Sequence, residues 1–288
     1  MLNRFCAHPL WEVNDTLAKV AQQAAETVIR HARLVSVTTR EVLEDTDIAI
    51  ARGRVAYIGI CGHTAEHCIG PETTVVDATG LYAAPGLFDT HVHIESSMVG
   101  PAEYARAVVP HGTVGIYADP HEVANVCGLE GVRAMWEDTA RTPLKTMLTT
   151  PSCVPAVLGV EDTGSSIDAS QVAESMRWDS VVALGEMMNF PGILSCEQNA
   201  LDEVRETLKA DRVVTGHYVA ADDDRGLSAY IAAGVTSCHE SGSFTDVISK
   251  LRMGMYVQLR QGSAWLNLPG YLPELVASGV DTSHCLLC

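Results

Sequence analysis

Two histidines separated by one residue point more directly to chemistry than any other part of this sequence. His91 and His93 close the stretch Ala84-Pro85-Gly86-Leu87-Phe88-Asp89-Thr90-His91-Val92-His93. Side chains alternate in direction along a strand, so the two imidazoles would point the same way and could bind one metal ion together. The spacing therefore predicts a metal site.

Further candidate ligands follow other apolar runs, each at the point where a predicted strand ends. They are Asp119, Glu186, His217 and His239. In a parallel barrel the carboxyl ends of all strands lie on one face, so these side chains should converge. Imidazole and carboxylate donors suit Zn, Mn, Fe and Co, and no cluster of cysteines indicates a structural zinc knuckle.

The number of donors indicates two metal ions. Four histidines and one glutamate exceed a three-ligand site, and a carboxylate can bridge two ions about 3.5 to 4 Å apart. Such a pair lowers the pKa of a water toward roughly 7, which makes hydrolysis the expected reaction class. Taken alone, His217 or His239 could instead be a hydrogen-bonded barrel residue, and Glu186 a solvated loop acid; their joint occurrence at strand ends favours ligation.

Two other features have a competing structural interpretation. Asp119-Pro120-His121-Glu122 could place a carboxylate and an imidazole at the mouth of a pocket, or merely begin a turn and a helix. Cysteines such as Cys153 and Cys238 more often pack as small apolar groups than act as nucleophiles, so no thiol mechanism is expected.

The elements that would position these residues alternate between apolar runs and helix-like stretches at roughly 20 to 35 residues, which is typical of repeated βα units. The pattern predicts an α/β fold with a parallel (β/α) barrel over residues 84–288. The predicted strands are 86–91, 114–119, 146–150, 181–186, 212–217, 235–239, 255–260 and 284–288. The predicted helices are 101–109, 128–139, 169–177, 197–209, 227–233, 244–252 and 272–278.

Two shorter regions precede the predicted barrel. Short β-like pieces broken by Arg52-Gly53-Arg54 and Gly59 predict a small β-domain over residues 27–83. Helical spacing of apolar residues from Asn14 to Arg30 predicts an amphipathic opening helix, which makes residues 1–26 a helical N-terminal segment.

Charge and composition exclude several kinds of partner. Asp and Glu outnumber Lys and Arg by 36 to 19, and the formal net charge of −17 repels nucleic acid and anionic membranes. Nine cysteines, an odd number scattered along the chain, favour a reducing cytoplasm over secretion. No signal peptide or membrane span is expected, because no apolar run is long enough.

Longer stretches around these residues resemble the amidohydrolase superfamily and, within it, the adenine deaminase family. The likeness runs from about Ala32 to the last residue, and the histidine pair alone would identify only the superfamily. The similar segments are Ala84 to Met98, Ala118 to Val126, Pro151 to Ala156, Gly185 to Gly192, Gly216-His217, His239-Glu240 and Leu251 to Tyr256.

The resemblance implies a (β/α)8 barrel beside a small β-domain, a binuclear Mn or Fe site, and conversion of adenine and water to hypoxanthine and ammonia. It assigns His91 and His93 to one metal, His217 and His239 to the other, and Glu186 to a bridge between them. Glu186 and His239 are the expected catalytic residues, and Glu95, Ser96 and Asp119 the expected purine contacts. A homo-oligomer is also expected.

One departure from the family lies at the end of the chain. The family follows its eighth strand with Thr-Asp-Asp, whose first aspartate is a metal ligand and proton acceptor, and continues into a long portion that completes the β-domain as a composite β-sandwich. This chain ends at Cys288, so a barrel truncated at its eighth strand is expected. The alternatives are a catalytically impaired fragment, or another amidohydrolase that acts on a cyclic amide or a C–N bond.

Overall fold

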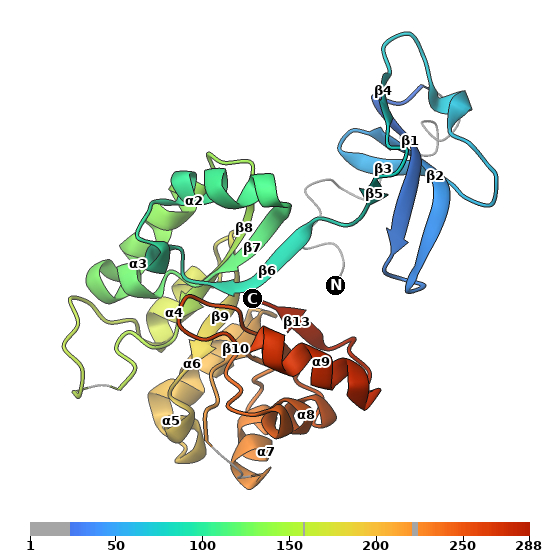
Figure 1. Ribbon diagram of the computed structural model, residues 1–288. Helices are drawn as coiled ribbons and strands as arrows, with labels where there is room; N and C mark the ends of the chain where they lie inside the picture. Colours follow the sequence, from blue (N-terminus) through green and yellow to red (C-terminus); the bar gives the residue numbers. More distant parts are fainter. Residues whose placement is uncertain (1–23, 158, 221–223) are drawn as a thin grey trace. The chain divides into compact units, whose positions relative to one another are not determined.

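The computed structural model describes residues 24–157, 159–220 and 224–288, and the chain divides into two compact units at Pro85 and Gly86 (Figure 1). The first unit is a five-stranded sheet in the order β3-β2-β1-β4, with β5 also paired to β1. Its strands are β1 (Thr27–Ser36), β2 (Glu41–Ala51), β3 (Arg54–Gly59), β4 (Thr74–Asp77) and β5 (Tyr82–Ala83). A small core of Val28, Ala49, Ala65 and Cys68 lies on this sheet, beside the short helix η1 (Glu66–Cys68).

The predicted opening helix is wrong at its C-terminal end; residues 14–23 lie outside the described residues. Ala25 N donates to Cys68 O of η1 at 2.7 Å and Glu26 N to Ile50 O of β2 at 3.1 Å, so neither makes the hydrogen bonds of a helix. From Thr27 onward the chain is β1, and Val28 pairs with β2 on one side and β4 on the other. The β-branched run Thr27-Val28-Ile29 favours an extended backbone because its side chains pack well on a pleated sheet.

The second unit is an α/β barrel of eight parallel strands that follow one another in chain order, as predicted. One ladder has the order β10-β9-β8-β7-β6 and the other the order β11-β12-β13. The strands are β6 (Leu87–Val92), β7 (Thr113–Ala118), β8 (Lys145–Pro151), β9 (Val181–Met187), β10 (Val213–Gly216), β11 (Ser237–Cys238), β12 (Tyr256–Leu259) and β13 (Cys285–Leu287). Each overlaps one of the predicted strands.

The two ladders meet through few contacts, so the barrel is incomplete. A single bridge between Val214 and Val235 joins the end of β10 to the start of the second ladder. At the other junction, Thr90 Oγ1 donates to Leu287 O at 2.7 Å and Gln258 Nε2 donates to Thr90 O at 2.8 Å. Among the described residues, no strand pairing joins β13 to β6.

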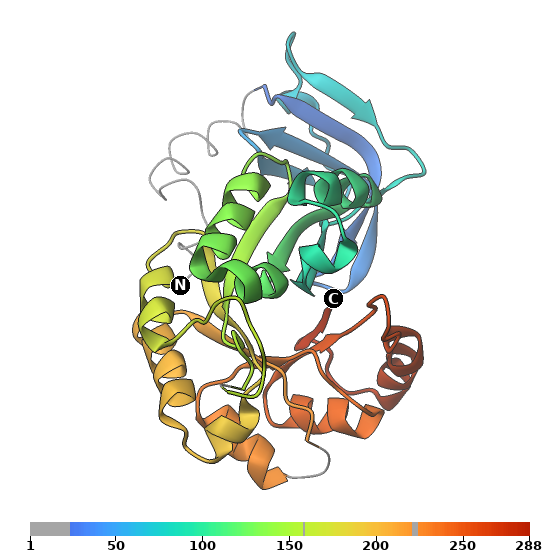
Figure 2. The same cartoon turned by 90° about the vertical axis from the view of Figure 1, so that its left-hand side faces the viewer.

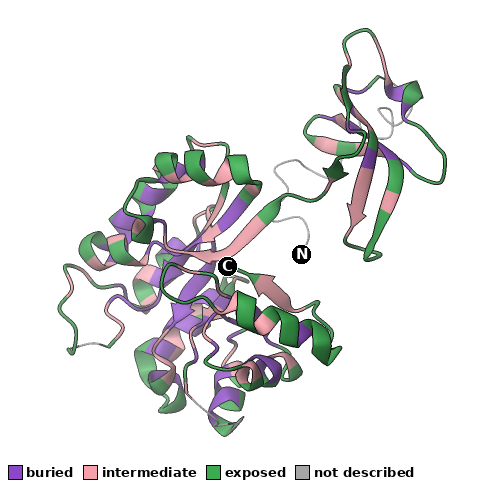
Figure 3. Ribbon diagram, in the orientation of Figure 1, coloured by how far each residue is buried: buried purple, intermediate pink, exposed green. Residues whose placement is uncertain are grey.

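Helices lie around the outside of the strands in this unit (Figure 2). They are α2 (Pro101–Val108), α3 (His121–Thr139), α4 (Ala169–Ser175), α5 (Phe190–Leu194), α6 (Gln198–Lys209), α7 (Asp224–Ala232), α8 (Phe244–Arg252) and α9 (Leu268–Ser278), with the short turns η2 (Ile94–Ser97) and η3 (Val109–His111). Buried side chains concentrate on the central strands between these helices (Figure 3). In the part of the chain that the structure describes, none of the helices has the length and apolar character needed to cross a membrane.

Two helices differ from the sequence prediction. The short helix α5 was not predicted, and α3 begins at His121 rather than at Gly128. Gly128 interrupts α3 with a positive φ of 59°, and a Cβ there would meet Ser165 Oγ at 2.5 Å. The glycine therefore marks a kink within the helix rather than its beginning.

Candidate metal centre

Glu186 lies at the centre of a cluster of histidines at the carboxyl ends of the strands. It belongs to β9, whose seven residues are all buried, and its own exposure is 3%. Glu186 Oε1 lies 2.9 Å from His121 Nδ1, and Oε2 lies 2.8 Å from His217 Nδ1 and 3.0 Å from His239 Nε2. One carboxylate thus connects side chains from three other segments of the chain.

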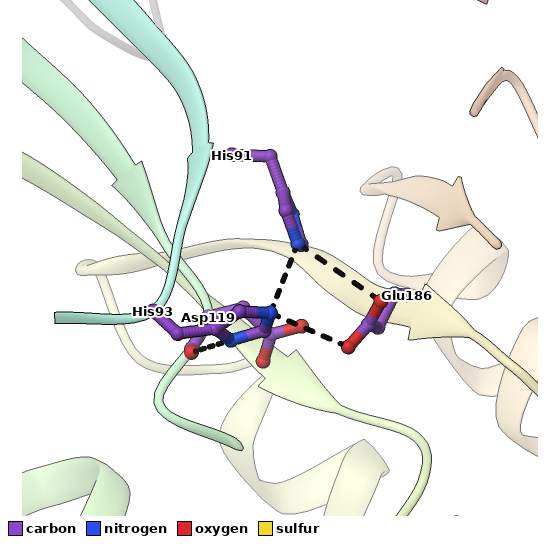
Figure 4. Close-up of side chains that lie close together, drawn as sticks. All are labelled: His91, His93, Asp119 and Glu186. Carbon is purple, nitrogen blue, oxygen red and sulfur yellow. Dashed lines mark hydrogen bonds and ion pairs between the residues drawn. The ribbon is translucent and has the colours of Figure 1, made fainter. Parts of the chain in front are cut away.

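The first histidine pair comes from β6 and the residue that follows it (Figure 4). His91 Nε2 and His93 Nε2 are 3.2 Å apart and lie 3.9 Å and 3.5 Å from Glu186 oxygens. The other ring nitrogen of His93 lies 2.9 Å from the backbone oxygen of Asp119, which orients the ring. With Asp119 and Glu186 these residues each offer one ligand atom within 4.8 Å of the others.

The second pair consists of His217, directly after β10, and His239, directly after β11. His217 Nδ1 and His239 Nε2 are 3.1 Å apart, and with Glu186 they form another group whose ligand atoms lie within 4.8 Å. The rings of His91 and His239 stack with centroids 3.9 Å apart, so the two pairs adjoin. The structure therefore brings together all five side chains predicted as metal ligands.

Burial and neighbouring side chains together determine the pKa values of these groups. Burial alone would raise the pKa of Glu186, but hydrogen bonds with His121, His217 and His239 hold it well below its usual value. Burial and the neighbouring His239 lower the pKa of His91 well below its usual value, and burial also lowers that of His239. Glu186 is therefore ionised while His91 and His239 are neutral at pH 7, which is the protonation state that metal ligation requires.

The donor atoms fit a divalent metal ion. Both carboxylate oxygens of Asp119 are buried without a hydrogen-bond partner, and so is His239 Nδ1. Buried polar atoms normally have a partner, and unpaired oxygens within a group of histidines are what a bound cation would satisfy. Burial and the charge of Glu186 raise the pKa of Asp119 to about 7 in the metal-free chain.

His121 and Cys153 form a third group with Glu186 that was not among the predicted ligands. Cys153 Sγ lies 3.1 Å from His121 Nε2, and burial raises the pKa of this thiol well above its usual value. Burial disfavours the charged form of His121, but the Glu186 carboxylate outweighs it and raises the pKa of His121 to about 9. The sequence feature that pointed to His121 was its position in the stretch Asp119-Pro120-His121-Glu122.

A cavity of about 480 Å³ opens onto the cluster. Of the predicted purine contacts only Ser96 lines it, and the Ser96 hydroxyl donates to Glu122. Glu95 accepts from Val123 N at 3.2 Å through one oxygen, and Asp119 is fully buried behind the histidines. Part of the opposite wall consists of Glu240, Arg260 and Trp265, which sequence reasoning missed.

Residues 82–278 match the model of the amidohydrolase family. The chain belongs to this family. The match spans the whole strand-end cluster, from His91 to His239, and the predicted resemblance is confirmed.

Among curated proteins, this amidohydrolase is similar to adenine deaminases. It is 54% identical over 289 aligned residues to adenine deaminase from Clostridium botulinum (strain Loch Maree / Type A3), covering all of this chain and 48% of the relative. It is 45% identical to adenine deaminase from Moorella thermoacetica, over 97% of this chain and 46% of the relative. The chain thus spans about half the length of the curated relatives it matches.

Solved structures support the same fold at low sequence identity. β-Aspartyl dipeptidase from Fervidobacterium islandicum superposes with a TM-score of 0.60 at 16% identity, over 91% of this chain and 71% of that one. Atrazine chlorohydrolase from Arthrobacter aurescens, solved with zinc, gives a TM-score of 0.56 at 13% identity, over 81% of this chain and 65% of that one. These likenesses concern the fold alone.

Proposed function

We propose that this chain carries the metal centre of an adenine deaminase, which hydrolyses adenine to hypoxanthine and ammonia with two Mn or Fe ions. The observation that carries the proposal is the position of Glu186, whose carboxylate oxygens face both histidine pairs at 2.8 to 3.9 Å. The 54% identity to an adenine deaminase supports adenine as the substrate.

Each residue has a role that follows from its surroundings. His91 and His93 would hold one ion, His217 and His239 the other, and Glu186 both. Bound divalent ions would lower the pKa of a water and polarise the carbon that it attacks. Because the pKa of Glu186 is held low, its carboxylate stays ionised and can bridge two cations at neutral pH.

Glu186 and His239 also retain the proposed catalytic role. Both line the cavity, where His239 Nε2 and a Glu186 oxygen lie 3.0 Å apart. A cavity of about 480 Å³ lies in the range of pockets that enclose small molecules. Ser96, Glu95 and Asp119 remain the proposed purine contacts; Ser96 lines this cavity directly, whereas Asp119 is equally well placed to face a metal ion.

The decisive assay incubates the purified chain with Mn²⁺ or Fe²⁺ and adenine, and follows hypoxanthine and ammonia. We expect turnover that chelation abolishes and that Glu186→Gln lowers by about 10³-fold or more, since several kcal/mol of metal-dependent stabilisation is lost. Glu203→Gln is the matched control, because Glu203 is equally buried, at 2%, but lies on α6 away from the histidines.

The results separate the alternatives. Turnover that survives chelation or Glu186→Gln would rule out the binuclear mechanism. Turnover of a cyclic amide without adenine turnover would favour a different amidohydrolase activity. Stoichiometric metal binding with no turnover of either substrate would favour a catalytically impaired fragment.

Three further predictions belong to this proposal. Exposed apolar side chains on the first unit, among them Val55, Ile58 and Val75, are the support for residues 27–83 as the first part of a composite β-sandwich. The free thiols of the described cysteines favour a cytoplasmic protein. A homo-oligomer stays a prediction, which sedimentation of the purified chain can test.

A further inference from the structure

Lys250, on α8, has a side chain with no exposed surface. Its ammonium lies 3.0 Å from Tyr218 O, 3.4 Å from Ser241 Oγ and 2.9 Å from Asp246 Oδ2, and it also donates to Glu240 O. Removing an ammonium from water costs several kcal/mol unless its hydrogen bonds are replaced. The four acceptors supply that replacement, and three of them, on Tyr218, Glu240 and Ser241, belong to loops that are thereby fixed around the charge.

The two backbone oxygens bound by Lys250 belong to the residues that directly follow the second histidine pair. Tyr218 follows His217, and Glu240 follows His239. Lys250 therefore connects the two loops that carry these imidazoles. The distance between His217 Nδ1 and His239 Nε2 is 3.1 Å.

Strand pairing alone holds these loops weakly. The strand β11 has only two residues, and a single bridge between Val214 and Val235 joins its ladder to that of β10. The Glu240 side chain adds a second connection, because it forms a two-pronged ion pair with Arg260, just past the end of β12. Lys250 and Arg260 thus hold Glu240 through its backbone and its side chain.

We propose that Lys250 is a positioning residue that sets the geometry of His217 and His239 for the second metal ion. The proposal rests on the metal ligands of the proposed function. Its ammonium does not touch the histidines; it fixes the backbone that carries both. Residues that orient metal ligands from behind typically change metal affinity by 10- to 100-fold when they are removed.

The test compares Lys250→Met with Leu275→Ala in the full chain. Met keeps most of the apolar stem, whereas Leu275, 1% exposed, belongs to an apolar cluster with Val247 and Ile248 of α8 that includes no residue of either loop. Mn²⁺ alone is titrated into each metal-free chain by calorimetry, and backbone hydrogen exchange is followed without metal. Asp246→Asn serves as a milder second variant in case Lys250→Met does not fold.

We expect Lys250→Met to weaken one of two Mn²⁺ sites by at least about tenfold and to leave the other unchanged. We also expect faster exchange confined to residues 217–220 and 239–242, and a weaker effect of the same kind in Asp246→Asn. Leu275→Ala should lower stability while both sites keep their affinities. Unchanged Mn²⁺ binding and exchange in Lys250→Met, or equal loss at one site in Leu275→Ala, would overturn the proposal.

Failure of the metal centre on which the proposed function depends gives a different result. In that case the parent chain binds no Mn²⁺, and the exchange experiment alone decides whether Lys250 orders the two loops. Faster exchange of both loops in the metal-free variant would support the positioning role, and unchanged exchange would refute it.

Discussion

Two glutamates of the second unit, Glu186 and Glu203, are buried to a similar degree but have different neighbours. Glu186 is 3% exposed and lies among histidines, whereas Glu203 is 2% exposed and accepts one hydrogen bond, from Asn199 Nδ2 at 2.8 Å. Burial raises the pKa of Glu203 to about 8, while the histidines hold the pKa of Glu186 well below its usual value. The same side chain is therefore neutral in one place and charged in the other at pH 7.

The difference shows that burial alone does not make a carboxylate into a ligand. Withdrawal from water favours the protonated form, which cannot bind a cation well. Hydrogen bonds with three imidazoles reverse this preference at Glu186, so its carboxylate stays negatively charged although it is buried. At Glu203 such imidazoles are not among the causes that act on the pKa, and burial keeps the side chain protonated at pH 7.

Metal removal should have the largest effect on stability, and this effect should depend on Glu186 but not on Glu203. A ligand present at 100 times its Kd stabilises the fold by about 2.7 kcal/mol, so two ions should contribute about 5 kcal/mol. We expect chelation to lower the unfolding free energy of the parent chain and of Glu203→Gln by this amount, measured by urea unfolding. Glu186→Gln should show little response to chelation; an undiminished response would mean that Glu186 is no ligand.

The next effect is a pH dependence at Glu203. Its folded pKa, about 8, lies above the ordinary 4.5, so its ionisation costs nothing below the ordinary value and progressively more as pH rises toward 8. We expect Glu203→Gln to gain roughly 3 kcal/mol of stability relative to the parent between pH 5 and pH 8. Thermal and urea unfolding at several pH values measure this, and a constant difference would contradict a neutral Glu203.

A smaller effect should come from the hydrogen-bond partner of Glu203. Asn199→Ala removes a bond that lowers the pKa of Glu203, so carboxyl carbon NMR should show this pKa rise further. The loss of stability should be about 1 kcal/mol. Gln198→Ala, which removes an exposed bond to Asp202, is the control and should change stability by less than about 0.5 kcal/mol.

The smallest expected effect concerns a carboxylate at the surface. Asp168 begins α4 and accepts from Ser170 N and Gln171 N at 2.9 and 3.0 Å, and these and the Ser170 hydroxyl lower its pKa. Asp168→Ala should cost about 1 kcal/mol at pH 7. Because a lowered pKa stabilises the fold only above the ordinary value, this cost should shrink as pH falls below about 4. A cost equally large at pH 7 and at about pH 2 would show that the charge of Asp168 contributes nothing.

The barrel could be predicted because stretches rich in apolar residues alternate with helix-like stretches along the chain, as in repeated βα units. All eight predicted strands overlap observed ones, from β6 at Leu87 to β13 at Cys285. The sequence supports two conflicting predictions for the start of β1, because Val28 and Ile29 fit both the helix predicted over residues 14–30 and the β-domain predicted from residue 27. Their pairing with β2 and β4 decides for the strand. The five-residue helix α5 is too short to show a period.

The candidate site could be predicted for those of its residues that lie at the ends of strands. Glu186, His217 and His239 do so, and the structure gathers them with the first histidine pair. His121 begins a helix instead, and only the fold brings its ring to 2.9 Å from Glu186. Lys250 looks like an ordinary charged helical residue in the sequence, since only the fold brings Tyr218 O and Glu240 O within hydrogen-bonding reach of its ammonium.

The order of strands in the first ladder also bears on synthesis. Every strand from β7 to β10 pairs with the strand before it in the chain, so the ladder can assemble as the polypeptide emerges. Glu186 is then made before His217 and His239, two of the three histidines that hold its charge. A nascent chain that ends after β9 therefore lacks two of the three imidazoles that lower the pKa of this carboxyl in the folded protein.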